Sequence, residues 1–227
     1  ILTTLNMEDW NLLNDFPNKD NVLAVIKDET LVFENEYLDD SKRIQKSNFA
    51  NIPIYPDDLK DLLPEKIDGF VLNPLNRYDF PLETIEFLKS FNVPIFLSVQ
   101  GFLRVCDIEV NGNCIIKLDN FDKLSIILEG VSAIFLDESE ANIIGMDYDV
   151  DEIVITNGSF GSRIVGDGEI RIDAVKCENV VDTTGCGDTY MASYISQKLL
   201  LKSSKFAGNF ASFIASEKIK NFGPYNS

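Results

Sequence analysis

The sequence predicts an α/β fold built around a largely parallel sheet, and two observations lead to this. Short, almost continuously apolar runs recur along the 227 residues, as expected for central strands that are covered on both faces. Helical patterns lie between these runs, and such alternation is typical of parallel sheets. Since 45% of the residues are hydrophobic and no linker or repeat interrupts the chain, we expect one domain over residues 1–227.

The apolar runs predict the strands in chain order. Helical spacing is clearest over residues 81–91, where Pro81 suits a first turn and Leu82, Ile85 and Leu88 share a face. A shorter helix is predicted over residues 57–63. The predicted strands cover residues 1–5, 22–26, 31–33, 70–72, 95–99, 133–136 and 153–156.

Two regions interrupt the alternation of strands and helices. Residues 22–26 and 30–37 are predicted to pair as antiparallel strands of a small projecting sheet. Residues 105–110 and 114–118 flank Asn111-Gly112, which is a strong hairpin turn. We interpret this hairpin as an ordinary decoration of the domain.

The composition excludes several classes of function. A formal net charge of −17 repels nucleic acid and anionic membranes, so we expect neither as a partner. An acidic protein that binds a phosphate must neutralise it locally, with a metal ion, backbone amides or a few Lys and Arg. The absence of His excludes Ser-His-Asp triads and His metal ligands. A general base must therefore be Asp, Glu, Lys, Tyr or Cys.

The four cysteines contain no C-x-x-C pair, which argues against a structural zinc site. Their scattered positions in a chain with a large core indicate a reducing compartment, and we expect the cytoplasm. No apolar run approaches the length of a membrane span, and no signal peptide is visible. The sequence starts at Ile1 rather than Met, so we expect the natural N-terminus to lie before Ile1.

The most informative stretch is Asp182-Thr183-Thr184-Gly185-Cys186-Gly187-Asp188, which leads into a helical run to Leu201. Two glycines around one small residue allow a sharp turn and a close approach of backbone to a ligand. A turn of this kind that opens a helix presents free N–H groups at the positive end of the helix dipole. We therefore predict an anion hole formed by Gly185, Cys186 and Gly187.

Asp188 is predicted in the first turn of that helix, beside the anion hole. A carboxylate there accepts a proton from a hydroxyl that attacks phosphorus, while the amides hold the charge of the moving phosphoryl group. The alternative is that Asp188 only caps the helix and the glycines only form a turn. Cys186 has two interpretations as well, a thiol with a lowered pKa or a small space-filling residue.

This stretch resembles the C-terminal signature of the ribokinase-like (PfkB) carbohydrate kinases, D-[TP]-[TV]-G-[AC]-G-D. The resemblance implies a Rossmann-like domain with a small β lid, whose strands fall within about residues 20–50. It implies ATP as donor, Mg²⁺ and a monovalent cation as cofactors, and Asp188 as base. The acceptor is then an alcohol of a sugar, polyol or nucleoside, and lid strands often pair in a homodimer. The alternative function is a non-catalytic nucleotide-binding or regulatory protein on the same fold.

Two further segments resemble the nucleotide site of this family. Thr156, Gly158 and Gly161 match a T-x-G-x-x-G that follows a strand, which implies contact with the nucleotide phosphates. A hairpin turn explains the same glycines, and the two interpretations are compatible. Asn209 lies in a run of small residues that resembles the helix beside the adenine, and an ordinary core helix explains that run equally well.

Asp137 and Glu140 resemble the family's N-x-x-E, which organises Mg²⁺ through water. Asp137 stands where the family usually has Asn. A capping Asp followed by solvated helix glutamates is the alternative.

The acceptor residues suggested by the resemblance are Asn35 in the lid strands and Gln100 and Arg104 after a predicted strand, with Asn73 nearby. Surface solvation explains any one of them. The family's N-terminal segment, with its first strand and Gly-Gly acceptor motif, is not found before Ile1.

Overall fold

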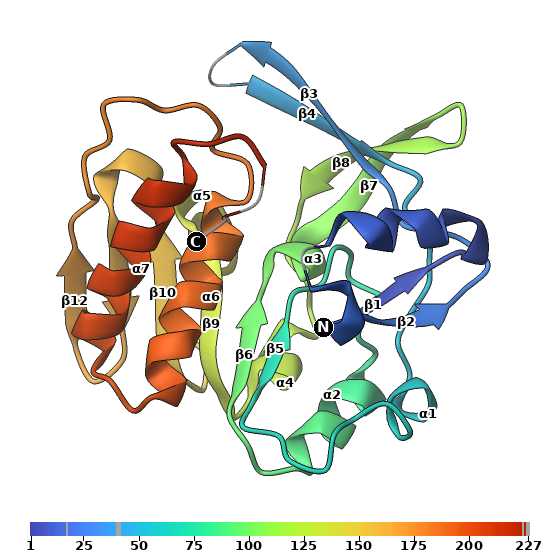
Figure 1. Ribbon diagram of the computed structural model, residues 1–227, viewed down its shortest axis with the longest axis horizontal. Helices are drawn as coiled ribbons and strands as arrows, with labels where there is room; N and C mark the ends of the chain where they lie inside the picture. The colour runs from blue at the N-terminus through green and yellow to red at the C-terminus, as the bar shows by residue number, and fades with distance from the viewer. Residues whose placement is uncertain (17, 40–41, 224, 226–227) are drawn as a thin grey trace. The chain divides into compact units, whose positions relative to one another are not determined.

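The computed structural model of the chain describes residues 1–16, 18–39, 42–223 and 225, and divides into two compact units (Figure 1). The first unit comprises Ile1–Ile67, Asn73–Asn92 and Gln100–Ile127, and the second comprises Asp68–Leu72, Val93–Val99 and Leu128–Ser227. The expectation of one domain stays a prediction.

A six-stranded sheet forms the centre of the second unit, in the order β12-β11-β10-β9-β6-β5. The pairs β10–β9, β9–β6 and β6–β5 are parallel, whereas β11 and β12 continue the sheet in antiparallel fashion. This confirms the mostly parallel sheet that the sequence predicts. The strands are β5 (Phe70–Leu72), β6 (Ile95–Ser98), β9 (Val131–Asp137), β10 (Val150–Thr156), β11 (Ser162–Val165) and β12 (Glu169–Ile172).

The helices of the second unit are α5 (Glu138–Ile144), α6 (Cys186–Leu199) and α7 (Ser204–Lys218), with a short 3-10 helix at Gly158–Phe160. α6 and α7 lie side by side against the sheet (Figure 1). Their contact is close because α7 presents small residues, Ala207, Ala211 and Ala215, to the core. Gly208 lets α7 approach the sheet, since a Cβ there would lie 2.7 Å from Ile172 Cγ1 on β12.

The core of the second unit also contains buried tyrosines from α6. Tyr194 is fully buried and meets the ring of Phe135 edge to face, with the ring centroids 5.6 Å apart. The hydroxyl of Tyr190 is hydrogen-bonded to Ser162 Oγ at 2.7 Å, which satisfies both buried groups and ties α6 to β11.

The first unit contains the parallel pair β1 (Leu2–Leu5) and β2 (Leu23–Ile26), connected through 3-10 helices at Met7–Asp15 and Lys19–Asn21. Residues 22–26 were expected to pair with residues 30–37, and this is wrong. The parallel partner lies about twenty residues earlier in the chain, and local turn signals do not reveal such a partner. The remaining helices along the chain are α1 (Pro56–Leu59), α2 (Leu82–Lys89), α3 (Gln100–Leu103) and α4 (Leu124–Leu128).

A second sheet of the first unit has the order β3-β4-β8-β7. Its strands are β3 (Phe33–Asp39), β4 (Lys42–Ser47), β7 (Arg104–Val110) and β8 (Asn113–Leu118). β3 pairs antiparallel with β4, as lid strands within residues 20–50 would, and β4 also pairs with β8. The hairpin β7–β8 is thus part of this sheet, which corrects its interpretation as a decoration.

The β7–β8 hairpin turns at Asn111 and Gly112, which both have positive φ, as the Asn-Gly pair predicts. A disulfide joins Cys106 to Cys114 across the two strands. Disulfides are rare in reducing compartments, so this bond runs against the compartment that we expected from the cysteine positions.

Two features are absent from the described residues. None of their helices combines the length and the apolar character that crossing a bilayer requires. They also contain no cluster of three or more His, Cys, Asp or Glu side chains placed to hold a metal ion.

We predict that reduction of the Cys106–Cys114 disulfide lowers the free energy of unfolding by about 2.5 kcal/mol, because the open loop regains entropy when unfolded. Urea unfolding with and without dithiothreitol measures the difference, and Cys177→Ser serves as the control because Cys177 is free. An unchanged midpoint under reductant contradicts the prediction.

Candidate active site

The candidate site lies at the carboxyl edge of the parallel strands in the second unit. β9 ends at Asp137 and β10 ends at Thr156, and the two residues are register partners in the sheet. Ligands of open α/β sheets bind beyond this edge, where loops and helix amino termini converge. α6 begins here through the signature turn at residues 182–188.

Gly185 fixes the shape of the signature turn. It is the N-cap of α6 and has φ +74°, a left-handed conformation that favours glycine. Asp182 stabilises the approach to the turn by accepting a hydrogen bond from Thr184 N at 2.9 Å. No heavy atom lies within 4 Å of a Cβ built on Gly185 or Gly187, so the space beside the turn is open.

The backbone N–H groups of the turn differ in their availability. Within the described part of the chain, no acceptor binds the N–H of Gly185 or Gly187. The N–H of Cys186, in contrast, donates to Thr183 O at 3.1 Å. The predicted anion hole of three amides is therefore corrected to two open donors, and Cys186 contributes its backbone to the turn itself.

Asp188 lies in the first turn of α6 and is exposed. Because Gly185 holds the N-cap position, the interpretation of Asp188 as the capping residue is wrong. A carboxylate at this point lies at the positive end of the helix dipole, beside the open N–H groups of the turn.

Cys186 acts as a space-filling residue. Its side chain packs against the core cluster of the second unit, and burial raises the pKa of its thiol. The interpretation as an activated thiolate is therefore not supported.

Asp137 and Glu140 form a capping box at the start of α5. Asp137 Oδ1 accepts from Glu140 N at 2.9 Å, and Glu140 Oε2 accepts from Asp137 N at 2.8 Å. Asp137 thus caps the helix, as the alternative states, but Glu140 is 3% exposed and is not the solvated glutamate that the alternative expects. A role toward Mg²⁺ stays a prediction.

Thr156, Gly158 and Gly161 form the turn between β10 and β11. Asn157 N donates to Gly161 O at 2.8 Å, and a Cβ on Gly161 would collide with the backbone oxygen of Ile172. The glycines therefore serve a hairpin turn, as one of the two interpretations states. Asn209 is exposed on α7.

The residues predicted at the acceptor all belong to the first unit. Arg104 is 5% exposed, and its guanidinium donates to Gln100 Oε1 at 2.7 Å and to Leu75 O at 2.9 Å. The same guanidinium lies over the ring of Phe33, 4.5 Å from its centroid. Asn35 is two residues from Phe33 on β3, so it shares that face of the strand, and it accepts from Gln45 Nε2 at 3.0 Å. The structure thus brings Gln100 and Arg104 into contact.

The comparisons with known proteins agree with this arrangement. The family model described as pfkB family carbohydrate kinase matches residues 122–227, which include β9, β10, α6 and the whole signature turn. Residues 122–227 therefore resemble this ribokinase-like family. The ribokinase-like fold of the chain is confirmed by its similarity to a pyrophosphate-dependent kinase of the ribokinase family, with a TM-score of 0.83 and 21% sequence identity. The superposition covers 98% of this chain and 81% of the kinase chain.

Two other relatives are more specific in name. The ribokinase of Arabidopsis thaliana, solved with ribose and ATP, has a TM-score of 0.70 and 18% sequence identity to this chain. The superposition covers 98% of this chain and 76% of the ribokinase chain. A nucleoside kinase of Methanocaldococcus jannaschii is 29% identical over 128 residues, 47% of this chain. The match spans 42% of that kinase's length.

A buried lysine holds the signature turn in place, and the sequence analysis did not identify it. Lys218 on α7 is 2% exposed, and its Nζ donates to the backbone oxygen of Asp182 at 3.1 Å and lies 3.2 Å from Asp182 Oδ2. Hydrogen bonds from Thr184, with a smaller contribution from Lys218, lower the pKa of Asp182 to about 2. A lysine at helical spacing after Ala211 and Ala215 is the signal that would have indicated it, because those positions face the core.

We predict that Lys218→Met lowers the free energy of unfolding by about 2 kcal/mol, which is typical of losing a hydrogen bond from a charged group. Lys220→Met is the matched control, since Lys220 is exposed just after α7 and forms a surface ion pair with Glu217. Urea unfolding compares the two variants. Equal midpoints for both would contradict a role for Lys218 in holding the turn.

Proposed function

We propose that this protein is an ATP-dependent phosphotransferase that moves the γ-phosphoryl group to an alcohol of a sugar or related small molecule. The observation that carries the proposal is the signature turn, where open N–H groups of Gly185 and Gly187 adjoin the carboxylate of Asp188 at the amino terminus of α6. Phosphoryl transfer requires mainly positioning and charge stabilisation, and these groups supply both.

In the proposed mechanism, Asp188 accepts the proton of the attacking hydroxyl. The two amides and the positive end of α6 stabilise the charge on the transferring oxygens. The phosphates lie beside Thr156, Gly158 and Gly161 at the same edge of the sheet. Asn209 contacts the base of the nucleotide. The acceptor is held by Asn35, Gln100 and Arg104.

Asp137 and Glu140 suit Mg²⁺ in their chemistry, since carboxylate oxygens are the ligands it prefers and it retains several waters. We propose that they hold it through water, as the oxygens that the capping box engages remain acceptors. When bound, the ion neutralises charge on the donor phosphates. A monovalent cation and lid-strand pairing in a homodimer belong to the same proposal. So does a cytoplasmic location, which supplies ATP and Mg²⁺, whereas the Cys106–Cys114 disulfide argues against it.

We predict that Asp188→Asn lowers kcat by three or more orders of magnitude, roughly the scale of general base catalysis, because an amide accepts no proton. A coupled assay of ADP formation over a panel of sugars, polyols and nucleosides measures it. Asp147→Asn, a change of the same charge on another exposed residue of the second unit, is expected to retain wild-type turnover. Wild-type turnover in Asp188→Asn would remove Asp188 from this role.

The same assay separates this proposal from the alternative of a non-catalytic nucleotide-binding protein. Turnover with any acceptor in the panel supports the kinase. Saturable ATP binding without turnover, also in the presence of Mg²⁺ and K⁺, supports the alternative.

Pyrophosphate is a second candidate donor, favoured by one observation. The TM-score to a pyrophosphate-dependent kinase is 0.83, against 0.70 for a ribokinase solved with ATP. The two donors share the phosphates that the signature turn receives, but only ATP has a base to contact Asn209.

We predict that Asn209→Ala raises KM for ATP about tenfold and leaves KM for pyrophosphate unchanged, because only the nucleotide loses a hydrogen-bonding partner. Turnover with pyrophosphate alone, and none with ATP, would replace ATP as the proposed donor.

A further inference from the structure

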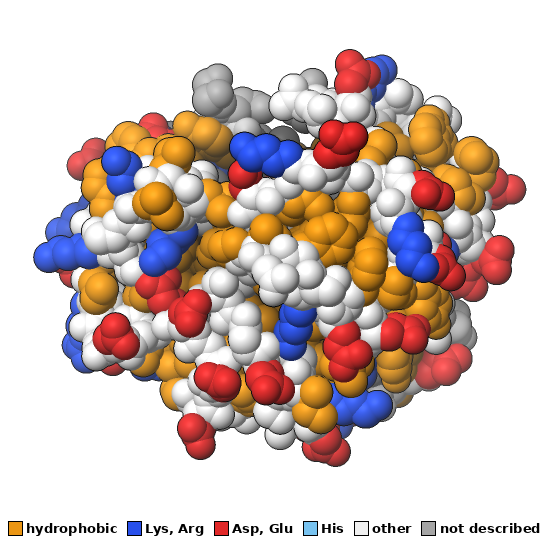
Figure 2. Space-filling view, turned by 90° about the horizontal axis from the view of Figure 1, so that it is seen from below, with side chains coloured by type: hydrophobic (Ala, Val, Ile, Leu, Met, Phe, Trp, Pro, Cys, Tyr) orange, Lys and Arg blue, Asp and Glu red, His pale blue; other side chains and the backbone are white. Residues whose placement is uncertain are grey.

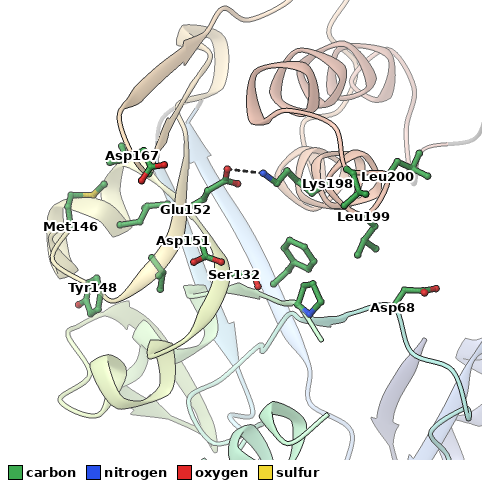
Figure 3. A pocket seen from close by; sticks show the side chains of 17 residues that line it. Asp68, Ser132, Met146, Tyr148, Asp151, Glu152, Asp167, Lys198, Leu199 and Leu200 are labelled. Atoms are coloured by element: carbon green, nitrogen blue, oxygen red, sulfur yellow. Dashed lines mark hydrogen bonds and ion pairs between the residues drawn. The ribbon is translucent and has the colours of Figure 1, made fainter. Parts of the chain in front are cut away.

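Two lysines that the second unit buries, fully or in part, have carboxylate partners. Lys198 Nζ lies 2.9 Å from Glu152 Oε1 in the lining of a cavity of about 1070 Å³ (Figure 3). Lys218, which is 2% exposed, binds Asp182. Burying a charge is costly unless it gains such partners, so buried cationic atoms without them require an explanation. Arg77 in the first unit has atoms of this kind.

Arg77 keeps one edge of its guanidinium inside the protein. Its Nε and Nη2 are buried, and no hydrogen-bond acceptor meets either atom within the described residues. The two nitrogens lie on the same edge of a planar fork, where their N–H groups point side by side. This spacing matches two oxygens of one carboxylate or phosphate. The unmet donors therefore indicate the class of group that would meet them, an oxyanion.

The guanidinium of Arg77 is held by an aromatic stack. Its Cζ lies 4.9 Å from the centroid of the Phe121 ring. Phe121 in turn stacks on the fully buried Phe102, with the ring centroids 6.0 Å apart. The stack fixes the plane of the guanidinium but engages none of its N–H groups. Because Arg77 as a whole is only half-buried, a turn within that plane brings the edge of Nε and Nη2 to a ligand.

The backbone on both sides of Arg77 is fixed. Asn76 is fully buried, and it donates from Nδ2 to Ala50 O at 2.8 Å and accepts from Tyr78 N at 2.7 Å. Asp79 Oδ2 accepts from Asn76 N at 3.0 Å. A loop held in this way presents its arginine in one place, so little further ordering is required when a ligand binds.

The charges around this loop favour an anion. Arg104 donates to the backbone oxygen of Leu75 at 2.9 Å, so a second guanidinium meets the loop that carries Arg77. The same loop carries one carboxyl group, that of Asp79, and burial raises its pKa. The protein is acidic overall, with Asp and Glu side chains spread over the face in Figure 2. Two guanidinium groups at one loop therefore provide a local attraction for an anion that the rest of the protein does not.

Arg104 connects this loop to the proposed acceptor residues. Its guanidinium also donates to Gln100 Oε1 at 2.7 Å and lies over the ring of Phe33 at the start of β3. Arg77 and Arg104 thus each stack on a phenylalanine and meet one loop of the first unit. An acceptor held by Gln100 and Arg104 lies beside the loop that carries Arg77.

We propose that Arg77 binds an anionic group of the phosphoryl acceptor, a carboxylate or a phosphate, through its Nε and Nη2. The acceptor is then a sugar acid or a sugar phosphate rather than a neutral sugar. That this ligand is a phosphoryl acceptor rests on the proposed function, whereas the anion contact itself requires no turnover.

Isothermal titration of the full chain without a phosphoryl donor, at constant ionic strength, tests the proposal. The probes are two matched pairs, D-gluconate with D-glucitol and D-ribose 5-phosphate with D-ribose, which report a carboxylate and a phosphate respectively. We expect the charged member of at least one pair to bind saturably and at least about tenfold more tightly than its neutral counterpart. Equal affinities within both pairs, or no saturable binding of either charged probe, overturns the proposal.

Substitutions of Arg77 test whether this residue makes the contact. Arg77→Met keeps an apolar stem on Phe121 and is expected to weaken the charged probe about tenfold and the neutral probe by less than about twofold. Arg77→Lys keeps the charge without the two-point contact, so its affinity is expected between those of wild type and Arg77→Met. Arg171→Met removes the same charge from a side chain that is 84% exposed and is expected to preserve both affinities. Equal weakening in Arg77→Met and Arg171→Met assigns the preference to net charge and overturns the proposal.

Urea unfolding without ligand separates binding from a structural role. The midpoint of Arg77→Met is expected to be no lower than that of wild type, because the variant removes a charged group with unmet buried donors. A lower midpoint together with unchanged affinity for the charged probe assigns Arg77 to packing on Phe121 and overturns the proposal. Absence of turnover with every acceptor would count against the proposed function alone, so the two failures are distinguishable.

Discussion

The candidate site depends on one constraint: backbone N–H groups at the amino terminus of α6 must stay open while the turn that carries them stays fixed. These two requirements conflict, because an N–H group that has no acceptor within the protein does not help to stabilise the turn. The structure meets them by fixing the turn from its other side. Gly185 adopts the left-handed conformation, Val181 and Asp182 donate their N–H groups to Ile219 O, and Lys218 binds Asp182.

The packing of α6 and α7 serves the same constraint. Small residues and Gly208 let α7 approach the sheet closely, which brings Lys218 beneath the signature turn. On α6, the Tyr190–Ser162 hydrogen bond fixes the helix to β11. α6 thus holds its amino terminus, the positive end of its dipole, at the proposed anion site.

The parts of the fold and site that the sequence predicts are local in the chain. The strands of the parallel sheet follow from apolar runs, and the signature turn follows from the spacing of Gly185, Gly187 and Asp188. The Asn111-Gly112 hairpin follows from its turn residues.

The features that were missed depend on distant partners. β2 pairs with β1 rather than with its neighbour, and the β7–β8 hairpin joins β4, because strand pairing across the chain leaves no local signal. The Cys186 N–H was counted as an open donor because the Thr183 carbonyl that accepts it is placed by the turn, not by the sequence pattern. Lys218 was not singled out from the sequence, because its burial against Asp182 depends on how α7 packs.

The most direct measurement is of the amides themselves. In ¹H–¹⁵N spectra of the full chain titrated with ATP and Mg²⁺, the Gly185 and Gly187 resonances should shift together, and Gly112 in the hairpin turn should stay in place. Saturable ATP binding that leaves Gly185 and Gly187 unshifted would contradict the claim that this turn receives the phosphoryl group.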